Sequence, residues 1–141
     1  MAMYQAKRKG KNTHQYFDYS LENTAMQRMF LENDMREALL EEQFIFYYQP
    51  KVDLLSGSLL GVEALIRWEK PDGKLIYPDQ FIPLAEDTGL IHDITKLVVR
   101  NACKKIVDWQ DGPLKDISIS INVSASDFSD MHFCWRCYIG G

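Results

Sequence analysis

The sequence predicts an α/β fold in which a hairpin of two strands precedes two helices and a third strand. Two segments rich in β-branched and aromatic residues flank the turn sequence Ser56-Gly57-Ser58, as the strands of a hairpin do. Residues 90–110 carry an apolar stripe at helical spacing, and residues 117–124 alternate apolar and polar side chains. A strand, a helical crossover and another strand form a βαβ unit, so we expect the second and third strands to be parallel.

The composition is that of a globular protein, with 46% hydrophobic and 26% charged residues among 141. A net charge of -4 gives no support for a nucleic-acid partner. No segment approaches the roughly 20 apolar residues of a membrane span, and no apolar segment follows the basic N-terminus as in a signal peptide. We therefore expect a cytoplasmic chain without a membrane segment, within a parent protein whose possible membrane anchor upstream stays open.

The first part of the chain predicts helices before the sheet. Residues 1–10 have the pattern of a helix end, because Lys7-Arg8-Lys9 precedes Gly10. A chain that begins at the end of a helix is expected to start inside a larger protein. From Leu21 to Glu42 apolar residues recur at helical steps without Gly or Pro, which predicts one long helix or two abutting ones.

Turn and capping signals place the other elements. The first predicted strand begins at residue 44 and runs through Pro50 toward Leu54, and the second covers residues 59–68. The short loop between them makes them antiparallel. A helix over residues 79–86 ends at Thr88-Gly89, before the stronger helix of residues 90–110. Cys103 falls on the apolar side of that second helix and is expected in the core.

Strand alternation sorts the polar side chains onto one surface. Glu63, Leu65 and Arg67 share one face of the second strand, and Trp68 lies on the other. Asn122 shares a polar face of the third strand with serines. This pattern brings Glu63, Arg67 and Asn122 onto one concave surface.

The position of Gln49 depends on the hairpin register, which the sequence leaves open. A three-residue loop pairs Leu55 with Leu59 and places Gln49 opposite Leu65, on the face of Glu63. A two-residue loop turns Gln49 to the other face.

Each of these residues also has an ordinary structural interpretation. Glu63 and Arg67 are spaced for a plain ion pair, Asn122 suits a turn after a strand, and Gln49 precedes a proline. Residue spacing alone therefore does not establish a catalytic site.

Six segments, in order, resemble the EAL family of cyclic-di-GMP phosphodiesterases over most of the chain. They are Phe46-Tyr47-Tyr48-Gln49-Pro50-Lys51, Gly61-Val62-Glu63-Ala64-Leu65-Ile66-Arg67-Trp68, Phe81-Ile82-Pro83-Leu84-Ala85-Glu86, Gly89-Leu90-Ile91, Ala102-Cys103 with Trp109, and Ile121-Asn122-Val123-Ser124. Residues 2–12 resemble the end of a GGDEF (diguanylate cyclase) domain whose signature loop is not in the chain, so no cyclase activity is expected.

The resemblance divides the chain into four parts. Residues 1–17 are the expected remnant of the GGDEF domain and residues 18–42 a linker helix region. Residues 43–133 are the N-terminal part of an EAL domain, and residues 134–141 are a tail that does not match the family.

The family resemblance implies a TIM-like (β/α)8 barrel whose first strand is antiparallel to the rest, here truncated after about three strands. It implies hydrolysis of one phosphodiester bond of cyclic di-GMP to linear pGpG with Mg²⁺ or Mn²⁺. Glu63 is then a catalytic metal ligand and Asn122 a second metal ligand, while Arg67 holds a substrate phosphate. Gln49, Leu65 and Glu86 are expected to line the nucleotide cleft.

The family's later motifs, which supply further metal ligands and a catalytic-site lysine, are not in this chain. We therefore expect the chain alone to lack a complete active site and to be inactive. A frameshift, a gene-prediction artefact or a deliberate truncation would account for the tail. The alternative is a non-catalytic EAL module that binds cyclic di-GMP or a protein, although the presence of Glu63 and Arg67 favours an enzyme. EAL domains of the parent could also form a homo-oligomer.

Overall fold

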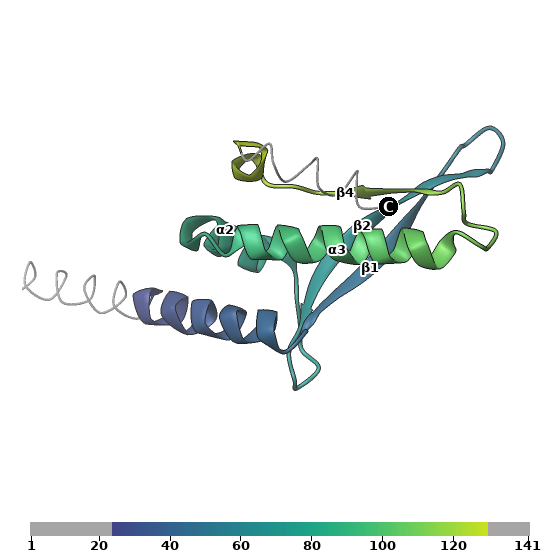
Figure 1. Ribbon diagram of the computed structural model, residues 1–141. Coiled ribbons are helices and arrows are strands. Elements are labelled where there is room, and N and C mark those ends of the chain that lie inside the picture. The colour runs from purple at the N-terminus through teal and green to yellow at the C-terminus, as the bar shows by residue number, and fades with distance from the viewer. Residues whose placement is uncertain (1–23, 130–141) are drawn as a thin grey trace, which may run out of the picture. The chain divides into compact units, whose positions relative to one another are not determined.

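The computed structural model describes residues 24–129. The parts predicted at residues 1–17 and 134–141 therefore lie outside the described residues, and the linker region 18–42 is described from residue 24. The elements are helix 24–40, β1 (Phe44–Val52), β2 (Leu59–Glu69), β3 (Leu75–Ile76), α2 (Pro78–Thr88), α3 (Ile91–Trp109), β4 (Ser118–Ile121) and the short 3-10 helix η1 (Ala125–Ser129) (Figure 1).

The chain divides into two compact units after Met35. Helix 24–40 is continuous across this division. The described part of the region predicted as one long helix or two abutting ones is therefore one helix. The sheet, helices α2 and α3 and the polar surface predicted above all belong to the second unit. Within residues 24–129, no helix combines the length and apolar character needed to cross a membrane.

The sheet has the predicted strand directions. β1 and β2 are antiparallel, and β4 joins β2 in parallel with Glu63 opposite Ser120. Helix α3 contacts both β2 and β4, as a crossover in a βαβ unit does (Figure 1). The two-residue β3 pairs with the far end of β2; it was not predicted, because two residues carry no periodicity.

The hairpin register differs from both registers considered above. Gln49 lies opposite Glu63 and not opposite Leu65. The turn is longer than expected, because Asp53 N donates to Ser58 O at 2.8 Å and the Asp53 carboxylate accepts from Ser56 Oγ at 2.7 Å. A bulge between Lys51 and Val52 completes the shift.

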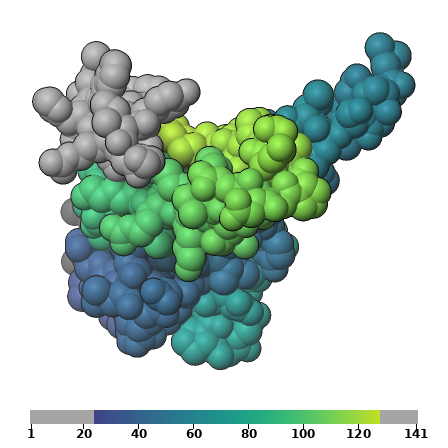
Figure 2. Space-filling model, turned by 45° about the vertical axis from the view of Figure 1, so that its right-hand side comes forward, coloured from purple at the N-terminus to yellow at the C-terminus, as the bar shows by residue number. Residues whose placement is uncertain are grey.

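The tip of the hairpin is exposed to solvent. Leu54 and Leu55 are 95% and 98% exposed, and Figure 2 shows the tip projecting away from the helices. The predicted pairing of Leu55 with Leu59 is therefore wrong, since Leu59 pairs with Val52 instead.

One face of the sheet is buried under α2 and α3. Phe44, Trp68 and Phe81 form an aromatic cluster with ring centroids 5.5 to 6.0 Å apart. All three side chains are buried. The prediction that Trp68 packs on the face opposite Glu63 is thus confirmed.

Helix α2 ends as predicted, because Gly89 adopts a left-handed conformation with φ 78°. Helix α3 buries the predicted stripe as far as Ala102. Cys103 is exposed, so its predicted core position is wrong. The buried stripe passes through Val98 and Ala102, and the residue after Ala102 is turned about 100° away from it.

Tyr48 attaches the second half of α3 to β1. Its hydroxyl donates to Asn101 Oδ1 at 2.6 Å, and its ring meets Trp109 edge-on at 5.8 Å. Burial, and then the charge of Asp108, raises the pKa of Tyr48. The hydroxyl therefore stays protonated and acts as a donor at neutral pH.

Gly61 is required for the close approach of β2 and β4. A Cβ at this position would lie 2.6 Å from Ser118 Oγ and 3.0 Å from the Ser118 carbonyl oxygen. The serine side chain can rotate away, but the backbone oxygen cannot. We expect Gly61→Ala to lower the free energy of unfolding by about 1–3 kcal/mol, measured by chemical denaturation.

Gly112→Ala is the matched control for this prediction. A Cβ on Gly112 would meet its nearest atom at 3.8 Å, which is an ordinary contact. We expect that change to stay within about 0.5 kcal/mol of the parent chain. Equal effects of the two substitutions would contradict the steric account.

Candidate functional site

The open face of the sheet carries the predicted polar residues. Gln49 and Glu63 are cross-strand partners, and Tyr47 lies opposite Leu65 in the same antiparallel pair. Residues directly opposite each other project to the same side of a sheet. Gln49 therefore does share the face of Glu63, although its partner differs from the expected one.

Glu63 and Asn122 meet at this face. Asn122 Nδ2 donates to Glu63 Oε1 at 2.9 Å. β4 ends at Ile121, so Asn122 lies immediately beyond the strand, whereas the prediction extended the strand to residue 124. Because β2 and β4 are parallel, the two side chains meet beside the carboxyl end of β4. This agrees with the prediction that Glu63 and Asn122 share one surface.

The Glu63–Asn122 pair suits a hard divalent cation. Carboxylate and amide oxygens are typical ligands of Mg²⁺, Mn²⁺ and Ca²⁺. The hydrogen bond engages Asn122 Nδ2 and Glu63 Oε1, which leaves the oxygens Asn122 Oδ1 and Glu63 Oε2 available as metal ligands. Within residues 24–129 no group of three or more His, Cys, Asp or Glu side chains gathers as a metal site. The pair thus fits as two ligands of a shell that other groups must complete.

Arg67 lies further along β2 and has different partners. Its Nη1 donates to the Ile66 carbonyl at 2.7 Å, and its Cζ lies 5.0 Å from the ring centroid of Tyr77. Cations are attracted to aromatic faces at such distances. Glu63 contacts Asn122 instead, so the plain Glu63–Arg67 ion pair is not what fixes these side chains.

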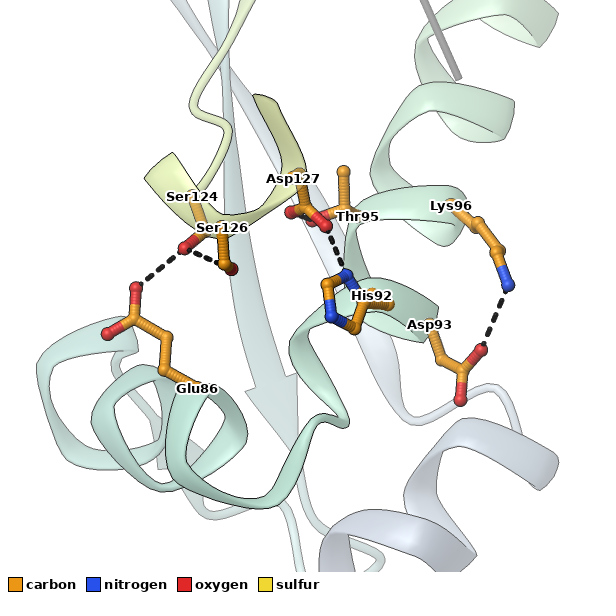
Figure 3. A network of polar contacts seen from close by, with 8 residues as sticks. All are labelled: Glu86, His92, Asp93, Thr95, Lys96, Ser124, Ser126 and Asp127. Carbon is orange, nitrogen blue, oxygen red and sulfur yellow. Dashed lines mark hydrogen bonds and ion pairs between the residues drawn. The ribbon is translucent and has the colours of Figure 1, made fainter. Parts of the chain in front are cut away.

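Glu86 reaches the same region from helix α2. Its Oε1 accepts a hydrogen bond from Ser124 Oγ at 2.9 Å (Figure 3). A cavity of about 430 Å³ lies between β2, α2, α3 and residues 122–124. Leu65, Glu86 and Asn122 line this cavity, whereas Gln49, Glu63 and Arg67 do not. Asn122 therefore connects the residues that line the cavity to Glu63, whereas Arg67 has partners of its own.

Several residues near this site were not predicted. Lys51 Nζ donates to Ser120 Oγ at 3.1 Å. Tyr47 and Lys51 lie two positions before and after Gln49 in β1, so the same period-2 argument would have placed both on the open face with Gln49. Tyr77 has no such signal, because it reaches Arg67 from the junction of β3 and α2.

Comparison with known proteins places this arrangement in a family. The model of a family described as "EAL domain" matches residues 32–138. The matched range begins before residue 43 and ends after residue 133, the predicted limits of this part of the chain.

Two curated relatives and a solved structure are similar to the chain. "Bifunctional diguanylate cyclase/cyclic di-GMP phosphodiesterase MucR" of Pseudomonas aeruginosa is 44% identical over 128 residues, 91% of this chain and 19% of the relative. "Signaling protein YkoW" of Bacillus subtilis is 41% identical over 91% of this chain and 16% of the relative. A solved structure described as "PaMucR Phosphodiesterase, c-di-GMP complex" is 44% identical with a TM-score of 0.71, over 77% of this chain and 44% of that structure.

The chain thus spans less than a fifth of the length of these two relatives. Its fold agrees with the N-terminal part of an EAL-type, TIM-like barrel with an antiparallel first strand.

Proposed function

We propose that this chain, which belongs to the EAL domain family, supplies the first part of a site that hydrolyses one phosphodiester bond of cyclic di-GMP to give linear pGpG. The observation that carries the proposal is the contact of Asn122 Nδ2 with Glu63 Oε1 at 2.9 Å. This contact brings the Asn122 amide to the Glu63 carboxylate beside a carboxyl strand end, the edge at which barrels of this class hold their active sites. The names of the MucR relative and of the similar solved structure support the same substrate.

Mg²⁺ or Mn²⁺ would be held by the Glu63 carboxylate and the Asn122 amide oxygen, together with ligands from outside residues 24–129. When bound, such a metal lowers the pKa of a water and offsets charge on the phosphoryl oxygens. The Arg67 guanidinium presents a planar fork of donors that suits a phosphate, and the ring of Tyr77 limits its orientation.

Gln49, Leu65 and Glu86 are proposed to line the nucleotide cleft. Gln49 is exposed beside Glu63 on the open face, so its amide can donate to and accept from a nucleotide. Leu65 and Glu86 line the cavity that Asn122 borders. They offer one apolar and one acidic wall.

The 141-residue chain is expected to be inactive by itself. A (β/α)8 barrel takes roughly 250 residues, and the described part would supply two metal ligands, Glu63 and Asn122. Incubation of the purified chain with cyclic di-GMP and Mn²⁺ is expected to give no pGpG. Metal-dependent pGpG that disappears with Glu63→Ala would contradict this expectation.

A chimera tests the proposed function directly. In this protein, called the MucR chimera below, residues 43–129 replace the aligned part of MucR from Pseudomonas aeruginosa, the 44% identical relative. We expect the chimera to convert cyclic di-GMP to pGpG when Mg²⁺ or Mn²⁺ is present. A folded chimera that binds cyclic di-GMP in calorimetry without cleaving it would contradict the proposal and identify a binding module instead.

We also propose a wider domain context. Residues 1–17 would end a GGDEF domain and residues 18–42 would link it to the EAL part. Of the tail predicted at residues 134–141, residues 139–141 lie beyond the family match, which ends at residue 138. The continuous helix 24–40 and the bifunctional name of MucR support this order. Genomic DNA with a GGDEF reading frame upstream, and an EAL continuation in another frame downstream, would support it. The absence of both would contradict it. A cytoplasmic location and association through EAL domains stay predictions.

A further inference from the structure

Asn122 is the first residue of a short connection, residues 122–124, that lies outside the sheet. β4 ends at Ile121, and η1 begins at Ala125. Residues 122–124 cross from one to the other, so the strand pairing holds this connection at its first end. What holds its second end also controls where the Asn122 side chain lies.

The second end is fixed by a buried carboxylate. Asp127, in η1, has a side chain that is 6% exposed. Its Oδ1 lies 2.5 Å from His92 Nδ1, and its Oδ2 accepts from Thr95 Oγ1 at 2.6 Å (Figure 3). Asp127 N also donates to Ser124 O at 3.0 Å. The carboxylate thus joins the connection to the first turns of α3.

This contact is strong enough to locate the backbone. A buried carboxylate that loses its hydrogen-bond partners retains the full cost of its desolvation. Displacing η1 from α3 would remove the Thr95 hydrogen bond and the His92 contact at once. The hydrogen bond that joins the connection to α2, between Ser124 and Glu86, is exposed and therefore weaker. The Asp93–Lys96 pair beside it is also exposed and does not contact Asp127.

We propose that Asp127 is a positioning residue for Asn122. With His92 and Thr95 it holds residues 122–124 against α3, so that the Asn122 amide stays on the Glu63 carboxylate. The inference deepens the proposed function, because it identifies what orients the second metal ligand. The positioning itself is a property of the chain without ligand.

The test follows the side-chain amide signal of Asn122 by NMR in the purified 141-residue chain. The Glu63→Ala chain shows where the Asn122 amide signal lies when the Asn122–Glu63 contact is broken. We expect Asp127→Ala to move the Asn122 signal most of the way to that position. Asp127→Asn, which keeps one acceptor oxygen, is expected to move it less.

Tyr48→Phe is the matched control, because it removes a different hydrogen bond between α3 and the sheet. It should lower the thermal midpoint without moving the Asn122 signal. A folded Asp127→Ala chain with the parent signal would overturn the proposal. If Asp127→Ala does not fold, Asp127→Asn decides, and an unmoved signal in that variant overturns the proposal as well.

The outcome is independent of the proposed function. The NMR signal is read without metal or nucleotide, whereas hydrolysis is read in the MucR chimera. If the chimera is inactive but Asp127→Ala shifts the Asn122 signal of the 141-residue chain, the phosphodiesterase proposal is rejected and the positioning role is kept. An active chimera with an unmoved signal would do the reverse.

Discussion

Glu63→Ala in the MucR chimera is expected to lower the rate of pGpG formation by roughly 1,000-fold, which corresponds to about 4 kcal/mol of transition-state stabilisation. The substitution removes the only carboxylate in the Glu63–Asn122 pair. Without it the remaining amide is a weak ligand for a divalent cation, because neutral oxygens offset less charge than a carboxylate does. The rate is measured by chromatography of pGpG at saturating Mg²⁺.

Glu69→Ala is the matched control for this prediction. It removes a carboxylate from the end of the same strand, where the side chain is exposed. We expect its rate to stay within about twofold of the parent chimera, the effect of a surface change of a few tenths of a kcal/mol. If Glu63→Ala also stayed within twofold, Glu63 would not be a ligand of a catalytic metal.

Trp68→Ala is expected to cause the largest loss of stability, about 3–5 kcal/mol in the free energy of unfolding. Trp68 is fully buried and packs against Phe44 and Phe81. Its indole Nε1 also donates to Gln43 Oε1 at 3.1 Å. Alanine leaves a cavity and an amide oxygen without its donor. Chemical denaturation of the 141-residue chain measures the change.

Leu55→Ala is the control, because Leu55 is large and apolar but 98% exposed at the hairpin tip. It is expected to change stability by less than about 0.5 kcal/mol. A loss below about 1 kcal/mol for Trp68→Ala would show that the aromatic cluster is not the centre of the core.

The faces of the strands could be predicted from the sequence, but the exact pairing could not. Alternation alone separates Glu63 and Arg67 from Trp68, because side chains in a strand alternate whatever the strand pairs with. The partner of Gln49 depends on the hairpin turn. Hydrogen bonds of Asp53 lengthen that turn, and a bulge follows Lys51; neither has a period in the sequence.

Contacts between distant elements explain the rest of what was missed. Asp127 reaches His92 and Thr95 across more than thirty positions of sequence. Tyr77 reaches Arg67 only because β3 brings it beside the end of β2. Such contacts follow from how helices dock on the sheet, which local patterns do not determine.

The central claim is that Glu63 and Asn122 serve one metal. A double-mutant cycle with Glu63→Ala and Asn122→Ala in the MucR chimera tests it most directly, because residues that act on one ligand have non-additive effects. We predict that the double variant is no slower at forming pGpG than the slower single variant. A double variant slowed by the product of the two single effects would contradict the account, since it would show that Glu63 and Asn122 act independently.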